Sequence, residues 1–112
     1  MAVAKFIEWM NLNYNTLHVV GYDFGAHVAG IAGKNSIRGR ISRIIGLDPS
    51  RPLFNENNSA SRLIIGDAQL VEVFHSNGDQ QGIFTAMGDV DYYVNNGKVQ
   101  PECTCEFGAY FK

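Results

Sequence analysis

The chain has 112 residues, enough for one domain with a modest core, and 46% of them are hydrophobic, as in an ordinary globular protein. Nine basic and eleven acidic residues give a net charge of −2 with no block of like charges, which argues against nucleic acid or an anionic membrane as a partner. No apolar run is long enough for a transmembrane segment, and residues 1–15 lack the apolar core and cleavage site of a signal peptide.

The first half of the chain predicts two helices and two strands. Apolar side chains at helical spacing between residues 3 and 10 predict an amphipathic helix. A buried strand is expected at residues 17–20 (LHVV), followed by a helix that ends around residues 33–35 (GKN). The next strand is expected at residues 41–47 (ISRIIGL). It should end at Asp48 because a proline follows, and proline stops both helices and sheet ladders.

The second half predicts two further strands between loops. Residues 49–66 are expected to be mostly loop, and residues 70–75 (LVEVFH) to form a strand. Residues 76–88 predict a polar loop or a pair of short edge strands, and residues 90–94 (VDYYV) a fourth strand that turns at residues 95–97 (NNG). Strands that alternate with helices predict an α/β fold with a mostly parallel sheet. Because such a sheet is usually covered on both faces, this chain looks like the middle of a larger domain.

The turn after the first strand has the spacing of a nucleophile elbow. Such an elbow reads Gly-x-Ser-x-Gly, and its strand–turn–helix geometry lifts the central residue above the end of a sheet. This chain reads Gly21-Tyr22-Asp23-Phe24-Gly25. We expect both glycines to be required, because side chains would collide at the strained turn. The scaffold for a nucleophile is present, with a carboxylate in place of the hydroxyl.

The two cysteines, Cys103 and Cys105, are separated by one residue. A disulfide between them would close a very strained ring, so a structural bridge would need partners outside this chain. Two cysteines are too few for a metal site, and no second pair of cysteines or histidines lies nearby. The count leaves the redox compartment open.

Four stretches follow one another in a specific order: LHVVGYDFGAHVAGIAGK, RIIGLDPSRPLF at 43–54, RLIIGDAQLVEVFHS at 62–76 and VDYYVNNGKVQPEC at 90–103. Together they resemble the pancreatic-type lipase family of α/β-hydrolases, which includes insect lipases and A1-type phospholipases. The resemblance covers roughly residues 15–103 and implies that residues 1–112 are a central fragment of such a domain, with central strands and elbow helix but an incomplete sheet. It implies secreted enzymes that hydrolyse triacylglycerol or phospholipid esters with a Ser-Asp-His triad, and the VNNGKVQP stretch is nearer the insect phospholipase-like members.

The resemblance assigns three positions of the family's catalytic site. Asp23 occupies the nucleophile position, and Asp48 of GLDP occupies the position of the triad acid. The backbone N–H of Phe24 corresponds to one half of the oxyanion hole, while the other half comes from an earlier loop that this chain does not contain. The family's triad histidine lies shortly after the second cysteine, whereas no histidine follows His75 here.

The stretch that corresponds to the family's calcium site also departs from the pattern. Ile64 stands where an aspartate is usual, while Arg62 and Asp67 are kept. We therefore expect no metal ion and no cofactor.

Asp23 has a structural and a chemical interpretation. Aspartate is a favoured helix N-cap, tolerates left-handed backbone and gains from the helix dipole, which together are worth about 0.5–2 kcal/mol. As a nucleophile toward an ester it would form a mixed anhydride as reactive as the ester, so covalent catalysis gains little. Toward an epoxide or halide carbon it would form an ordinary ester, and GYDFGAHVAG also resembles the elbow of epoxide hydrolases and haloalkane dehalogenases. The downstream motifs match lipases instead, which favours the capping role.

The other candidate residues also have two interpretations each. Asp48 is either a vestigial triad acid, which we favour, or a solvated loop aspartate before proline. Chain order alone allows a triad of Asp23, Asp48 and His75, but an apolar strand favours a core role for His75. His27 is expected to be a packing or supporting residue of the elbow helix, and His18 to be buried in its strand.

Three functions follow from these observations. The first is a lipase-family polypeptide that does not hydrolyse esters, either truncated or part of a longer non-catalytic homologue, favoured by Asp23 and the missing histidine. The second is an active secreted lipid esterase of which this sequence is incomplete. The third is a non-catalytic lipid-binding or yolk-type storage homologue. The family implies a lipid or ester substrate and an extracellular location, and the oligomeric state stays open.

Overall fold

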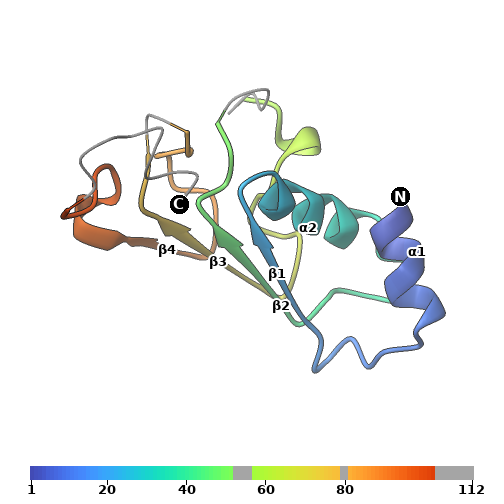
Figure 1. Ribbon diagram of the computed structural model, residues 1–112. Coiled ribbons are helices and arrows are strands. Elements are labelled where there is room, and N and C mark those ends of the chain that lie inside the picture. The colour runs from blue at the N-terminus through green and yellow to red at the C-terminus, as the bar shows by residue number, and fades with distance from the viewer. Residues whose placement is uncertain (52–56, 79–80, 103–112) are drawn as a thin grey trace.

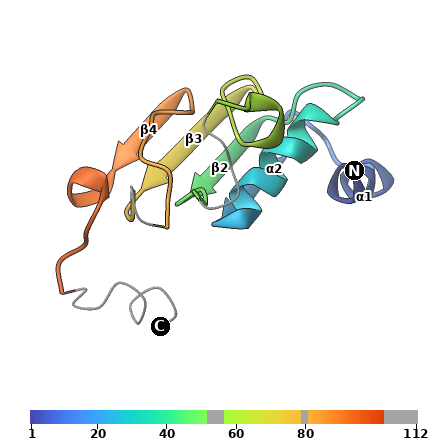
Figure 2. The same ribbon diagram turned by 90° about the horizontal axis from the view of Figure 1, so that it is seen from above.

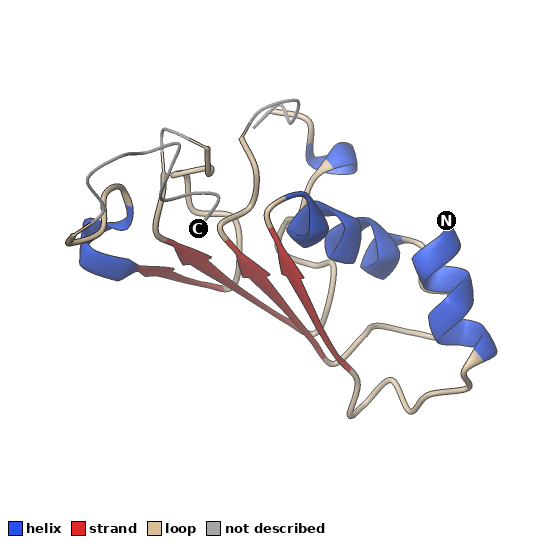
Figure 3. Ribbon diagram, viewed as in Figure 1, coloured by secondary structure: helices blue, strands red, loops and turns tan. Residues whose placement is uncertain are grey.

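The computed structural model describes residues 1–51, 57–78 and 81–102. Its helices lie on one side of a single sheet, as Figures 1 and 3 show. The elements in chain order are α1 (Ala2–Trp9), β1 (His18–Tyr22), α2 (Phe24–Lys34), β2 (Arg43–Leu47), the 3₁₀ turn η1 (Ser59–Ser61), β3 (Leu70–His75), β4 (Val90–Tyr93) and the 3₁₀ turn η2 (Val94–Gly97). This order confirms the predicted α/β class. β1 runs two residues beyond the predicted strand because it pairs with β2 along its whole length.

The four strands form a parallel sheet in the order β1-β2-β3-β4. Gly21 of β1 lies opposite Gly46 of β2 in the register. Because all four strands run the same way, the carboxyl ends of β1, β2 and β3 lie along one edge of the sheet (Figure 1). Asp23 follows β1 and Asp48 follows β2 at that edge, and β3 ends there at His75. The candidate site is therefore assembled at this edge.

The two faces of the sheet differ in what covers them. α2 packs on β1 and β2 over one face, and α1 lies beside α2 on the side away from the strands (Figure 2). On the other face Val20, Tyr22 and Tyr92 are 58%, 56% and 42% exposed. His18 shares that face and is exposed, so the prediction that it is buried is wrong. The core between the helices, the loops and the covered face includes Ile7, Tyr14, Ala26, Ala29, Ile41, Ile44, Leu63, Ala68, Val71, Val73, Ile83 and Met87.

The first helix is amphipathic as predicted, although its buried stripe is narrow. Ala4 and Ile7 are buried, whereas Phe6 and Met10, which share the predicted apolar face, are 57% and 45% exposed. Among the described elements α1 contacts α2 and no strand, so only part of its apolar face reaches the core. No helix within the described ranges has the length and hydropathy needed to cross a bilayer.

The loops after β3 and β4 complete the described structure. Between residues 76 and 88 the chain makes isolated bridges at Gly78 and Gly82 rather than a pair of edge strands, and residues 79–80 lie outside the described ranges. The predicted turn after β4 is confirmed, with positive φ at Asn95, Asn96 and Gly97. Most of the loop expected at residues 49–66 is present, apart from η1 and the undescribed residues 52–56.

Candidate functional site

The elbow holds Asp23 in a strained backbone conformation between β1 and α2. Its φ of 57° and ψ of −117° lie outside the regions that ordinary side chains favour. The Asp23 amide donates to the Leu47 carbonyl at 3.0 Å, and the Asp23 carbonyl accepts from the amides of Ala26 at 3.3 Å and Ser50 at 3.2 Å. Backbone hydrogen bonds on both sides of Asp23 therefore maintain the turn, whatever side chain it carries.

The two elbow glycines have different reasons to be glycine. A Cβ on Gly21 would lie 2.1 Å from the carbonyl oxygen of Gly25, so only glycine allows β1 to approach the first turn of α2. A Cβ on Gly25 would meet no atom within 4 Å. The prediction that side chains would collide at both positions is thus confirmed for Gly21 and wrong for Gly25. The crowding comes from the Gly25 backbone pressing on β1, and the Gly25 Cβ direction points into open space.

Asp23 was predicted to cap the elbow helix, and the structure confirms its position but not the capping hydrogen bond. Asp23 is the N-cap residue of α2, but its side chain makes no capping hydrogen bond. An N-cap side chain usually reaches the helix amides from an extended backbone, which the elbow conformation does not provide. The carboxylate still lies at the positive end of the α2 dipole. Its neighbours Tyr22 and Phe24 are 56% and 46% exposed, so aromatic rings flank it on both sides in sequence.

Asp48 is tied to the turn that follows β3. Its Oδ1 accepts from the backbone amides of Ser76 at 2.6 Å and Asn77 at 3.0 Å, and its Oδ2 accepts from the Ser76 hydroxyl. Its own amide donates to the Phe74 carbonyl at 2.8 Å, with φ at 46°. These contacts exclude the interpretation of Asp48 as a solvated loop aspartate. Its role as a vestigial triad acid stays a prediction.

His27 and Ser50 together brace the elbow from behind. The His27 ring is fully buried, its Nε2 lies 2.8 Å from the Ser50 carbonyl, and its Nδ1 accepts from the Leu63 amide at 3.1 Å. Because Nδ1 is the acceptor, Nε2 carries the proton. The Ser50 amide in turn donates to the Asp23 carbonyl, so His27 supports the backbone at Asp23 through Ser50. The supporting role predicted for His27 is confirmed.

The electrostatic surroundings keep His27 neutral. Burial is the main cause that lowers its pKa below the ordinary 6.5, and the positive charges of Arg62 and Lys34 lower it further. The hydrogen bond to the Ser50 carbonyl and the negative charge of Asp23 oppose this shift. A neutral ring fits the two hydrogen bonds, because a proton on Nδ1 would remove its acceptor for the Leu63 amide.

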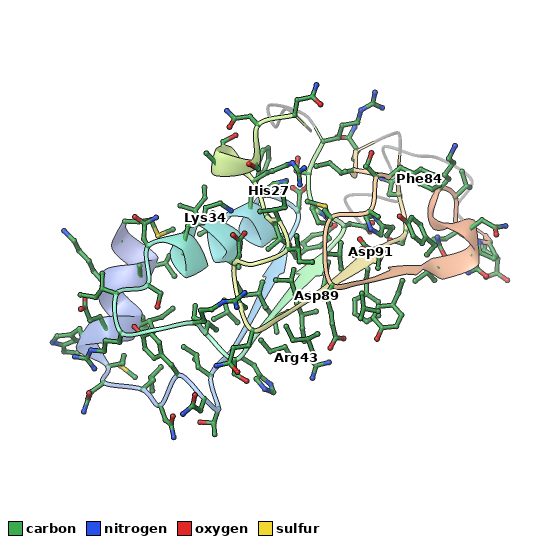
Figure 4. All side chains as sticks on the ribbon, turned by 180° about the vertical axis from the view of Figure 1, so that it is seen from behind. His27, Lys34, Arg43, Phe84, Asp89 and Asp91 are labelled. Carbon is green, nitrogen blue, oxygen red and sulfur yellow. The ribbon has the colours of Figure 1, made fainter. Side chains whose placement is uncertain are left out.

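His75 is a satisfied core histidine, as its position in an apolar strand predicts. Its Nδ1 lies 2.7 Å from the Ile83 carbonyl and its Nε2 lies 2.7 Å from Oδ1 of Asp91. Its ring is fully buried and stacks on Tyr93 with a centroid distance of 4.5 Å. Asp91, labelled in Figure 4, also accepts from the amides of residues 87 and 88. The structure therefore does not bring the His75 ring to Asp23 or Asp48 as a triad base.

The structure says less about the predicted oxyanion donor, the two cysteines and metal binding. Phe24 begins α2, where amide groups of the first helical turn face the elbow, and its role as an oxyanion donor stays a prediction. Cys103 and Cys105 lie outside the described residues. Within the described ranges no group of three or more His, Cys, Asp or Glu side chains is arranged to hold a metal ion.

The elbow presents a carboxylate, and both ring nitrogens of His27 and of His75 are engaged in the contacts above. The third histidine, His18, lies at the far end of β1 from the elbow. Sequence reasoning did not identify Ser50 or Asp91, although both lie in the stretches that resemble the family, because each acts on a histidine distant in the chain.

Comparisons with known proteins agree with the fold. A family model described as Lipase matches residues 1–109. The chain is 43% identical over 110 residues to lipoprotein lipase of Sus scrofa (90% of this chain, 23% of that protein) and 37% identical over 107 residues to phospholipase A1 member A of Mus musculus (96% and 23%). It is 38% identical over 102 residues to phospholipase A1 of Vespula vulgaris (88% and 30%). The chain spans about a quarter of the length of these relatives.

Proposed function

This chain belongs to the lipase family, and from that premise we propose that it does not hydrolyse lipid esters as it stands. The observation that carries the proposal is Asp23, a carboxylate in the strained elbow where acyl transfer needs a hydroxyl. Attack by this carboxylate on an ester would give a mixed anhydride, which removes no barrier. The hydrogen bonds of His27 and His75 support the same conclusion, because neither ring is placed to accept a proton at the elbow.

The first test measures ester cleavage directly. The purified chain is incubated with a short-chain nitrophenyl ester and with phosphatidylcholine vesicles, and the elbow peptide is examined by mass spectrometry for an acyl adduct. We expect turnover no higher than that of a histidine-free control protein, and no adduct. Turnover well above that background, or an acyl group on any residue, would contradict the proposal. Release of halide or of a diol from alkyl substrates would instead support alkyl-carbon chemistry at Asp23.

A substitution separates the two missing groups. Asp23→Ser restores the hydroxyl but supplies no base, so we expect no gain in ester cleavage, because removal of any triad member costs several orders of magnitude. Asp23→Asn is the matched control, since it keeps the size of the side chain and removes its charge. If Asp23→Ser gains activity that Asp23→Asn lacks, a base does reach the elbow.

Lipid binding without hydrolysis is the second candidate function. The exposed rings of Tyr22 and Phe24 beside Asp23 favour it, because exposed aromatic side chains are suited to apolar ligands and surfaces. We expect labelled phospholipid to bind the chain with no release of fatty acid, and Phe24→Ser to weaken that binding. Trp9→Ser on α1 is the control, since Trp9 is 78% exposed and far from the elbow in sequence. Absence of binding at micromolar lipid would remove this candidate.

An active, secreted lipid esterase of which this sequence is incomplete remains the alternative. The matches cover most of this chain but about a quarter of each relative, which is what such an esterase would give. It predicts that a longer coding sequence supplies a signal peptide, earlier strands and a histidine after the cysteines. The flanking transcript sequence distinguishes it from the first proposal.

A further inference from the structure

The carboxyl end of α2 carries an ammonium group surrounded by oxygen atoms. Lys34 Nζ donates to the carbonyl oxygen of Arg62 at 2.7 Å and to Oδ1 and Oδ2 of Asp67 at 2.7 and 2.6 Å. The Asp67 side chain is 4% exposed and that of Lys34 is 24% exposed. In Figure 4, which is seen from behind, Lys34 points from α2 toward the loop before β3. We call these three oxygens the oxygen cradle.

The cradle is built by a loop that packs directly against the helix. The Ile64 amide donates to Oδ2 of Asp67 at 2.9 Å, and the Asp67 amide returns a hydrogen bond to the Ile64 carbonyl at 3.2 Å. A Cβ on Gly33 would lie 2.2 Å from the Asp67 carbonyl oxygen, so glycine permits this approach. The neighbouring Leu63 amide is bound by His27, as described above. The loop is thus fixed to α2 at two points, at His27 and at the helix end seven residues later.

The residues present do not fit the calcium ion that the family resemblance implies for this stretch. Calcium takes six to eight oxygen ligands at about 2.3–2.6 Å. Here the cradle offers three oxygens, Ile64 contributes hydrocarbon in place of a carboxylate, and Oδ2 of Asp67 is shared with an amide. A divalent ion held by the same oxygens would lie against the Lys34 ammonium and be repelled by it.

We propose that the Lys34 ammonium is the built-in cation of this loop and takes the place of a bound metal ion. The lysine neutralises Asp67, binds the Arg62 carbonyl and so holds residues 62–67 on α2 without calcium. This inference does not depend on whether the elbow is catalytic. It implies that calcium leaves the loop unchanged in this chain, and that removal of the ammonium exposes a latent cation site.

The test measures hydrogen exchange of the Leu63 and Ile64 amides in the 112-residue chain, with calcium chloride or with EDTA. We expect the same exchange rates in both solutions. Lys34→Gln should speed exchange of the Ile64 amide by about tenfold or more, because a charge-assisted contact of its acceptor is lost. Lys5→Gln is the matched control, since Lys5 is an exposed lysine on α1. Slower exchange of the parent chain in calcium, or no effect of Lys34→Gln, would overturn the proposal.

A double variant tests whether the lysine occupies a cation site or only forms an ion pair. Lys34→Ser combined with Ile64→Asp removes the ammonium and adds a carboxylate to the cradle. We expect calcium, and magnesium much less, to restore slow exchange of the Leu63 amide. If calcium does not change the exchange rate of the Leu63 amide in the double variant, Lys34 and Asp67 form only an ordinary ion pair and the proposal is wrong. If Lys34→Gln alone unfolds the chain, the calcium response of the parent chain and of Lys34→Arg, which keeps a cation, still decides.

Discussion

At its amino end α2 follows a turn maintained by backbone hydrogen bonds, whereas at its carboxyl end it meets a loop through the side chain of Lys34. The elbow amide and carbonyl of Asp23 are bound whatever residue occupies that position, and its side chain makes no capping bond. Lys34, in contrast, makes three contacts with the loop through its one ammonium group. The side chain at the elbow can therefore change with little effect on the fold, while the packing of residues 62–67 at the other end depends strongly on the Lys34 side chain.

The largest effect is expected when a methyl group is added at Gly21, because the elbow depends on close contacts between backbone atoms. Gly21→Ala would place a Cβ 2.1 Å from the Gly25 carbonyl oxygen, and we expect it to lower the free energy of unfolding by about 3 kcal/mol or more. Gly25→Ala is the control, because the added methyl meets no atom within 4 Å and should stabilise the helix by roughly 0.4–1 kcal/mol. Urea denaturation followed by circular dichroism measures both. If the two substitutions changed the free energy of unfolding equally, the close backbone approach at Gly21 would not be what maintains the elbow.

Removing the brace behind the elbow should have the next largest effect. His27→Ala leaves the Leu63 amide and the Ser50 carbonyl without these partners, and we expect a loss of about 2–3 kcal/mol in the free energy of unfolding. His18→Ala, on the uncovered face, should change it by less than about 0.5 kcal/mol. Urea titration of the two variants compares them. A similar loss for both would contradict the assignment of the brace to His27.

The same brace predicts a pH dependence. Burial lowers the pKa of His27 below 6.5, so the unfolded chain binds a proton at a pH where the folded chain does not. Stability is then complete above about pH 6.5 and falls as pH drops from there toward the folded pKa. Urea midpoints between pH 8 and pH 5 measure this, and His27→Gln should remove part of the slope. A parent chain that gains stability over this range would contradict the prediction.

The smallest expected effect is the release of backbone strain at Asp23. Glycine adopts a φ of 57° and ψ of −117° at lower cost, so Asp23→Gly should stabilise the chain by about 1 kcal/mol. Asp23→Asn keeps the strain and removes the charge, and we expect it to lie closer to the parent. Thermal unfolding of the parent chain and the two variants measures the order of their stabilities. Destabilisation by Asp23→Gly would show that the carboxylate contributes to folding.

Local pattern was enough to predict most elements and the elbow. The strand at residues 70–75 begins and ends where the apolar run does, and α2 ends at Lys34, within the predicted stop. The elbow was recognisable because its glycine spacing reflects crowding between consecutive elements. Gly21 bears that out, while the open space at Gly25 depends on what lies beyond the turn. Such space has no signature in the local sequence.

The contacts that decide the chemistry were not predictable in the same way. His75 meets Asp91 sixteen residues away, and Lys34 meets Asp67 thirty-three residues away. Neither pair has a local spacing rule, because each forms only when strands and loops dock. The error for His18 has a related cause: alternation in a strand distinguishes two faces but does not say which face is covered. The stretch with Arg62 and Asp67 was expected to bind no metal ion, but no local pattern indicated that its oxygens would hold the Lys34 ammonium.

The uncovered face of the sheet has a practical consequence for handling this polypeptide. Val20, Tyr22 and Tyr92 present apolar surface there, and among the described strands β1 is paired along one edge only. An open strand edge beside exposed rings is a template for association between molecules. Self-association should therefore increase steeply with protein concentration. Light scattering should be measured at each concentration at which an unfolding curve is recorded.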